Sequence, residues 1–138
     1  MAQCSMPAQC LPNVKRIWLA LLASYCGVIF YLSHQSALPT PMLFAHQDKF
    51  CHVLAYAILG FLAFSYFIGV LASSRHAFVI AMVFSVFYGG SDEWHQSFVV
   101  GREADILDWL ADCVGALVAI SVRYTLGRYE RNHLEMPY

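Results

Sequence analysis

Four long apolar segments constrain the fold of this chain more than any other feature. They cover roughly residues 14–32, 50–71, 77–94 and 106–124, and each approaches the ~20 residues that an α-helix needs to cross a bilayer core. Charged side chains make up 12% of the chain, about half of the ~25% typical of soluble domains. A soluble domain of 138 residues has too little interior to bury this much apolar surface. The segments therefore predict an all-α membrane protein with four transmembrane helices in a compact bundle.

The connections between these segments are short, which favours one domain. We expect a tail at residues 1–13, the four-helix transmembrane domain at 14–124 and a second tail at 125–138. Ser33–Pro41 is polar and contains prolines, as expected of a loop, and Leu71–His76 is typical of a tight turn. The first segment has no small-residue cleavage motif behind it, so we expect a retained anchor. The five cysteines form no CxxC pair, which predicts neither a disulfide framework nor a zinc knuckle.

Basic residues divide unequally between the two sides of the predicted bundle. Six lie on the side of the termini, namely Lys15, Arg16, Arg75, Arg123, Arg128 and Arg131, whereas Lys49 and Arg102 lie on the other side. The positive-inside rule therefore predicts that both termini are cytoplasmic. The formal net charge of −1 offers no basic surface for nucleic acid, which we exclude as a partner.

Polar and small residues share one face of each of the last three predicted helices, at 100° per residue. These faces comprise Asp48, His52, Ala55, Tyr56, Leu59 and Ala63; Ala81, Ser85, Tyr88, Gly89, Asp92, His95 and Gln96, with Glu93 at the margin; and Asp105, Asp108, Asp112, Gly115, Ala116 and Ala119. Larger aliphatic side chains cover the rest of the fourth helix, including Leu107, Leu110, Val114, Leu117 and Val118. Small residues permit close helix packing, so we expect the three faces to meet in an acidic pocket that opens outward.

The carboxylates on these faces are costly in a membrane. An aspartate at mid-membrane carries a penalty on the order of 2.5–3.5 kcal/mol on insertion scales. Lys49, Arg102 and a protonated histidine are outnumbered by the nearby acids, which predicts protonated acids, a bound cation or a cationic substrate group. A divalent metal stays open as a cofactor, since oxygen and imidazole ligands can converge from three helices. The metal-binding motifs H-E-x-x-H and paired E-x-x-H are missing from the sequence.

The motifs "DKFCHVLAYAILGF" (48–61), "SDEWHQSFVVGREADILDWLADCVGA" (91–116) and "FYLSHQS" (30–36) resemble those of the VanZ-like family. This family of small bacterial membrane proteins is named for a protein associated with teicoplanin resistance. The resemblance implies a multi-pass protein of the bacterial cytoplasmic membrane with a role in the cell envelope. The residues that match the family pattern are Asp48, Lys49, His52, Tyr56, Asp92, Glu93, His95, Gln96, Arg102, Asp105 and Asp108. Asp112 departs from it, because the family often has asparagine there.

Three classes of function stay open. The first is an enzyme that acts on a lipid-linked or cell-wall substrate, with Glu93 or Asp92 as general acid or base, His95 as their partner and Asp108 as a fourth catalytic candidate. The second is a non-catalytic module that binds an envelope precursor, a lipid, a glycopeptide or a partner membrane protein. The third is a small proton-coupled transporter, which the apolar cytoplasmic half of the helices disfavours. The candidate binding residues are Asp48, Lys49, His52, Tyr56, Gln96, Arg102, Asp105 and Asp112.

Structural roles compete with these functional ones. Asp48 and His52 are spaced like a helix N-cap with an adjacent polar pair. Polar residues around Asp92 are also expected where a helix simply ends at the membrane surface. The acids of the fourth helix can hydrogen-bond between helices, and Arg102 is equally an orienting partner for a carboxylate, an anion clamp or a solvated loop residue.

Overall fold

The structure of the chain is a computed structural model that describes residues 12–36 and 43–134. Most of the predicted N-terminal tail, with Cys4 and Cys10, and residues 37–42 of the first loop lie outside this description. Within it, the chain forms α1 (Pro12–Ser33), α2 (Gln47–Val70), α3 (Ser74–Gln96) and α4 (Ile106–Leu134), with no β-strand. The all-α prediction is confirmed.

The helices extend beyond the predicted apolar segments, most of all in α4. This helix continues to Leu134, whereas the predicted apolar segment ends near Tyr124. Its added turns contain good helix formers such as Arg and Glu. Arg131 and His133 lie in the last turn, where positive charge interacts favourably with the helix dipole. Part of the predicted second tail is therefore helical.

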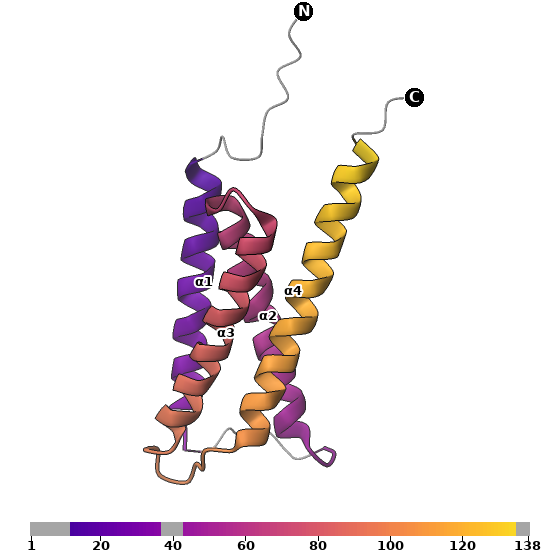
Figure 1. Ribbon diagram of the computed structural model, residues 1–138. Coiled ribbons are helices and arrows are strands. Elements are labelled where there is room, and N and C mark those ends of the chain that lie inside the picture. Colours follow the sequence, from indigo (N-terminus) through magenta and orange to yellow (C-terminus); the bar gives the residue numbers. More distant parts are fainter. Residues whose placement is uncertain (1–11, 37–42, 135–138) are drawn as a thin grey trace, which may run out of the picture.

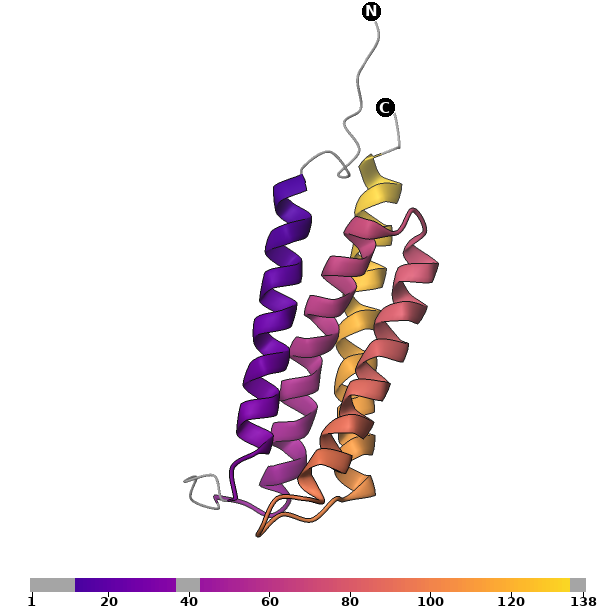
Figure 2. The same cartoon turned by 90° about the vertical axis from the view of Figure 1, so that its left-hand side faces the viewer.

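The four helices form an up-and-down bundle in which α2 contacts each of the others (Figures 1 and 2). The first turn of α1, the α2–α3 turn and the last turn of α4 lie at one end of the bundle. The α1–α2 and α3–α4 connections lie at the opposite end. We call this opposite end the acidic end, because it gathers Asp48, Asp92, Glu93, Asp105 and Asp108. Both α2 and α4 start there and run in the same direction.

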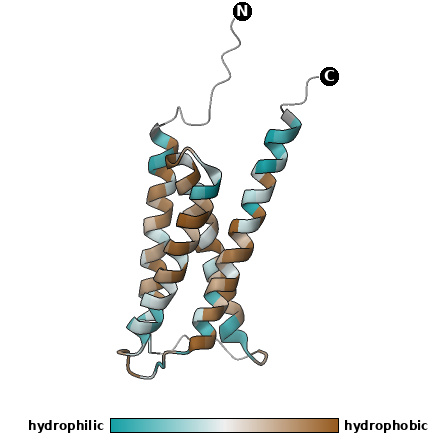
Figure 3. Cartoon of the chain, viewed as in Figure 1, coloured by the Kyte–Doolittle hydropathy of each residue, from teal (hydrophilic) through white to brown (hydrophobic). Residues whose placement is uncertain are grey.

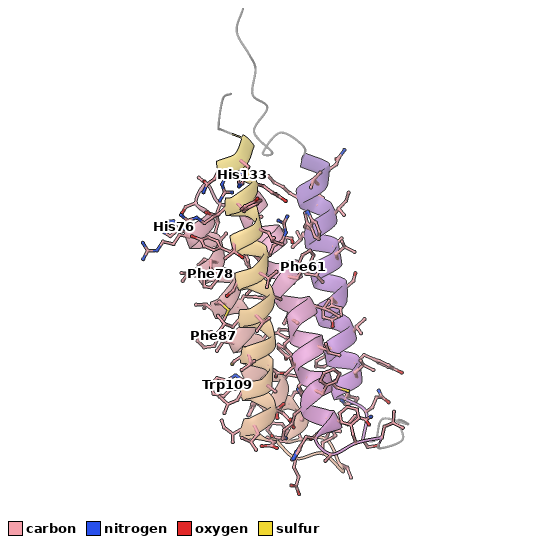
Figure 4. All side chains as sticks on the ribbon, turned by 90° about the vertical axis from the view of Figure 1, so that its right-hand side faces the viewer. Phe61, His76, Phe78, Phe87, Trp109 and His133 are labelled. Carbon is pink, nitrogen blue, oxygen red and sulfur yellow. The ribbon has the colours of Figure 1, made fainter. Side chains whose placement is uncertain are left out.

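The outer surface of the bundle is apolar along its middle. Figure 3 shows hydrophobic positions along the helices and hydrophilic ones gathered towards their ends. Phe87 on α3 is 75% exposed and Ile17 on α1 is 57% exposed, and Figure 4 shows Phe87 and Phe61 on the side of the bundle. Large exposed apolar surfaces of this kind are expected against lipid and not against water.

Two of the helices, α1 and α2, are long and apolar enough to cross a membrane by length and composition. Of the most apolar stretch of α2, 33% is buried, which is little for the core helix of a soluble protein. The charged residues of α3 and α4 lower their mean hydropathy, so the same criterion does not identify them as spans.

The predicted faces of α2, α3 and α4 do turn towards one another. On α4, Asp112, Gly115 and Ala116 are buried, while the large aliphatic residues assigned to its other faces are exposed, namely Leu107, Leu110, Val114, Leu117 and Val118. A Cβ at Gly115 would collide with the backbone of Val53 on α2. Glycine is needed here because the α2 and α4 backbones are in direct contact, as expected for membrane helices.

Candidate functional site

Polar side chains of α3 and α4 are buried near the acidic end of the bundle. Asp92, Glu93 and Gln96 on α3 are 7%, 7% and 3% exposed, and Asp112 on α4 is fully buried. Asp92 and Gln96 lie one helical turn apart on the same face of α3, and Glu93 lies at the margin of that face. Burial of three carboxyl groups is costly without partners, so the contacts of each group decide what the site can do.

A lysine balances the acids closest to the end of the bundle. Lys49 Nζ donates to Asp105 Oδ2 at 2.7 Å and to Asp108 Oδ1 at 2.9 Å, and lies 3.4 Å from Asp48 Oδ2. The hydrogen bond from Lys49 lowers the pKa of the Asp105 carboxyl group, with help from the backbone N–H of Leu107. We call Lys49, Asp48, Asp105 and Asp108 the lysine cluster.

The start of α2 differs from the one inferred from the sequence, whereas α4 begins at Ile106 as predicted. Asp105 precedes α4, and its Oδ1 accepts from the Leu107 backbone N–H at 2.8 Å, as an N-cap does. The cap interpretation of Asp48 is wrong, because the N-cap of α2 is His46, which forms no side-chain cap bond. Asp48 instead lies in the first turn of α2 and faces Lys49, where its charge favours the helix dipole.

A second group of ionisable residues lies one turn deeper. His52 Nδ1 on α2 is 2.9 Å from Asp112 Oδ1 on α4, and Glu93 Oε2 on α3 accepts from the Asp105 backbone N–H at 2.9 Å. One ligand-type atom from each of His52, Glu93 and Asp112 lies within 4.8 Å of those of the other two. We call these three residues the inner triad. A histidine and two acids at low dielectric are well suited to proton transfer or metal binding.

Gly89 on α3 makes room for the inner triad. A Cβ at this position would lie 3.1 Å from Asp112 Oδ2 and 3.2 Å from Tyr56 Cε1, both of which are tighter than ordinary contacts. Tyr56 is 1% exposed, and its hydroxyl group has no hydrogen-bond partner within the described ranges. Glycine therefore lets α3 approach the carboxylate of α4 directly.

Trp109 holds the start of α4 against α3. Its Nε1 donates to the carbonyl oxygen of Val86 at 3.0 Å, and Figure 4 shows the residue near the acidic end of the bundle. This contact fixes the rotation of α4, which places Asp108 and Asp112 towards α2.

Arg102 reaches the site through an amide. Its Nε and Nη2 atoms donate to Gln96 Oε1 at 3.1 and 2.7 Å, and Gln96 Nε2 donates to Asp92 Oδ2 at 3.2 Å. In the described ranges, no carboxylate lies within ion-pairing distance of Arg102. Arg102 is half-buried and contacts an amide, not a carboxylate, so no carboxylate of the described residues neutralises its charge.

A cavity of about 120 Å³ lies between α1, α2 and α3 beside these residues. Its lining combines apolar with polar side chains and comprises Ile29, Leu32, Ser33, Cys51, His52, Ala55, Tyr56, Asp92, Gln96 and Arg102. An engineered cavity of about 150 Å³ holds benzene, so this cavity has room for a small polar group such as a phosphate. His52 belongs both to the cavity wall and to the inner triad.

The contribution of α1 was missed in the sequence analysis. Ser33 is 4% exposed, and its hydroxyl group has no hydrogen-bond partner among the described residues. The hydroxyl groups of Tyr25 and Tyr88 tie α1 to the bundle by donating to the backbone of Ala55 and Cys26. The polar motif at the end of the first apolar segment, "FYLSHQS", was the signal that could have identified this wall.

His95 lies apart from the acids with which it was grouped. Its Nε2 is 3.2 Å from His34 Nδ1, and its ring lies 4.6 Å from that of Phe30 on α1. The structure thus brings together eleven of the twelve candidate residues in one connected region, through the contacts given above. His95 instead forms a histidine pair at the α1–α3 contact.

The comparisons with known proteins agree with the motifs that pointed to a family. The family model described as VanZ/LLP1 matches residues 17–127, which include α2, α3 and most of α1 and α4. This chain belongs to the VanZ/LLP1 family. The matched residues contain the lysine cluster, the inner triad and the cavity lining, so the site lies inside the VanZ/LLP1 domain.

A similar protein occurs in a yeast. An uncharacterized protein of the fission yeast Schizosaccharomyces pombe is 29% identical over 124 residues, which cover 88% of this chain and 73% of the yeast protein. No solved structure matches the chain. Membership of the VanZ/LLP1 family and the two apolar helices together indicate a membrane protein.

Proposed function

We propose that this chain is a membrane protein with four spans and cytoplasmic termini, whose site binds the anionic headgroup of a lipid-linked substrate. The observation that carries the proposal is the lining of the cavity, in which the apolar side chains of Ile29 and Leu32 occur together with His52 and Arg102. Such a cavity suits an amphiphile, because its volume accepts a headgroup while the lipid chain stays in the bilayer.

The charge of Arg102 selects an anion in this proposal. Its guanidinium group binds an amide oxygen and has further N–H donors. Arginine is well suited to phosphate and carboxylate groups because its planar fork donates two parallel hydrogen bonds. The carboxylates of Asp92 and the inner triad would repel an anion placed too deeply, which limits the headgroup to the side of the cavity near Arg102.

The neighbouring acids give the site a means of proton transfer. His52 lines the cavity and contacts Asp112, which is fully buried. While no metal ion occupies this pair, a histidine so placed can exchange a proton with a bound headgroup and pass it to the carboxylate behind it. Within the VanZ/LLP1 family, we propose that this activity serves the cell envelope and extends to glycopeptide resistance.

Native mass spectrometry of the full chain released from bilayers of defined composition tests the binding step. In bilayers made of phosphatidylcholine and phosphatidic acid, we expect wild type to retain bound phosphatidic acid in preference to phosphatidylcholine. Arg102→Gln should lower this retention about tenfold or more, since a hydrogen bond to a charged group is worth about 1.5–3 kcal/mol.

The matched control is Arg131→Gln, which removes an exposed arginine from the opposite end of the bundle. This variant should retain phosphatidic acid like wild type. Equal retention of the two lipids by wild type, or equal losses in the two variants, would refute an anionic headgroup site at Arg102.

A further inference from the structure

The inner triad contains two buried carboxylates, and in each of them one oxygen has a hydrogen-bond partner and the other has none among the described residues. Asp112 Oδ1 is paired with His52, and Glu93 Oε2 accepts from the backbone N–H of Asp105. The second oxygen of each group, Glu93 Oε1 and Asp112 Oδ2, is buried and has no hydrogen-bond partner in residues 12–36 and 43–134. Leaving a buried polar atom without a partner costs about 1–3 kcal/mol, and more for a charged group.

The two basic side chains of the site, Lys49 and Arg102, contact groups outside the inner triad. Lys49 binds Asp105 and Asp108 in the lysine cluster, and Arg102 binds Gln96. Within the described chain, the remaining group that can pair a positive charge with these carboxylates is His52, a member of the triad itself. Even a protonated His52 balances one of the two carboxylates, so the triad is short of positive charge.

The geometry points to a divalent cation. Three ligand-type atoms from α2, α3 and α4 lie within 4.8 Å of one another, so a small movement of the side chains would bring all three to the distance of about 2.0–2.2 Å at which nitrogen and oxygen ligands bind Zn²⁺. Gly89 leaves space beside Asp112 Oδ2 that a Cβ would fill. Metal sites in helical bundles are built in this way, from inward-facing side chains of several helices.

The ligand types select the class of ion. Mg²⁺ and Ca²⁺ prefer shells made of oxygen atoms, whereas imidazole suits Zn²⁺ and other transition metals. One imidazole with two carboxylates equals in number the three protein ligands of catalytic zinc sites, which keep a further position for water or substrate. Because His52 also lines the cavity, that position is adjacent to the space proposed for the headgroup.

We propose that His52, Glu93 and Asp112 bind one divalent transition-metal ion, of the class of Zn²⁺ or Mn²⁺. The ion supplies the missing positive charge and binds the two carboxylate oxygens that have no partner. The lysine cluster stays outside the metal site, since its acids already bind Lys49. This inference does not depend on the lipid substrate.

Metal retention by the full chain in lipid nanodiscs tests the inference. The protein is stripped with a chelator, loaded with Zn²⁺ or Mn²⁺, passed over a desalting column and measured by elemental mass spectrometry. We expect about one ion per wild-type chain, and no retention of Mg²⁺. Glu93→Gln and Asp112→Asn should each weaken binding by more than about a hundredfold, because even loss of an outer-shell partner typically costs 10–100-fold.

The matched control is Glu103→Gln, an exposed acid of the α3–α4 connection, which should bind like wild type. Retention by Glu93→Gln and Asp112→Asn equal to that of wild type overturns the proposal, as does a wild type that retains no ion. Wild type loaded with Co²⁺ provides a measurement that needs no variant. Its visible absorption should intensify on binding, and a spectrum identical to that of free aqueous Co²⁺ counts against the site even if a variant fails to fold.

Discussion

Replacement of Gly115 by alanine tests the close contact between α2 and α4 that aligns the site. An ideal Cβ at this position would lie 2.9 Å from the carbonyl carbon of Val53 and 3.0 Å from its Cα, and closer still to its oxygen. Overpacking typically costs about 1–3 kcal/mol. The upper end applies here, because the obstacle is helix backbone and not the flexible end of a side chain. Alanine recovers about 1 kcal/mol of helix propensity, so we expect a net loss of about 2 kcal/mol.

The assay is unfolding in mixed micelles titrated with sodium dodecyl sulfate and followed by tryptophan fluorescence. Gly27→Ala on α1 is the matched control, because a Cβ there meets no atom within 4 Å. It should gain up to about 1 kcal/mol from helix propensity alone, which places the two variants about 3 kcal/mol apart. If Gly115→Ala is as stable as Gly27→Ala, the helices do not approach as closely as described, and the argument for a preformed inner triad fails with it.

Two further predictions concern the lysine cluster and the role in cells. Lys49 lowers the pKa of Asp105. The lysine cluster should therefore stabilise the fold fully above the ordinary aspartate pKa of about 3.9, and this stabilisation should weaken as pH falls through the lowered pKa. The unfolding midpoint of wild type should drop in acid, and that of Lys49→Met should drop less. In a sensitive bacterial host, wild type should protect against teicoplanin more than vancomycin, and Glu93→Gln should abolish protection at matched membrane levels. A pH profile shared by the two proteins, or protection by Glu93→Gln, would contradict these expectations.

The fold was largely predictable because it depends on patterns that repeat along the chain. Helical periodicity assigned Asp112 and Gly115 to the buried face of α4 and Leu110 and Val118 to the exposed one, as observed. The end of α4 was not predictable from apolarity, since the helix continues through polar residues after Tyr124. Helix formation and membrane burial follow different rules, and hydropathy reports on the second alone.

The site was less predictable, because periodicity gives the face of a helix and not its partner. His95 and Asp92 share the inner side of α3, yet His95 turns to His34, which directly follows α1. Arg102 was open to several interpretations until its contact with Gln96 was known. The loop between α3 and α4 sets that contact, and loop geometry leaves little trace in a hydropathy pattern.

The parallel course of α2 and α4 explains why the acids divide into two groups of different character. Lys49 and His52 are one turn apart on α2, and Asp108 and Asp112 are one turn apart on α4. The two parallel helices therefore form two successive pairs, an outer pair of Lys49 with Asp108 and an inner pair of His52 with Asp112. The outer pair has a lysine, which stays charged at neutral pH. The inner pair has a histidine, whose charge changes readily, and it receives the further carboxylate of Glu93. Charge balance at the inner level therefore depends on a proton or a bound cation, which makes the inner triad the part of the bundle where a ligand can act.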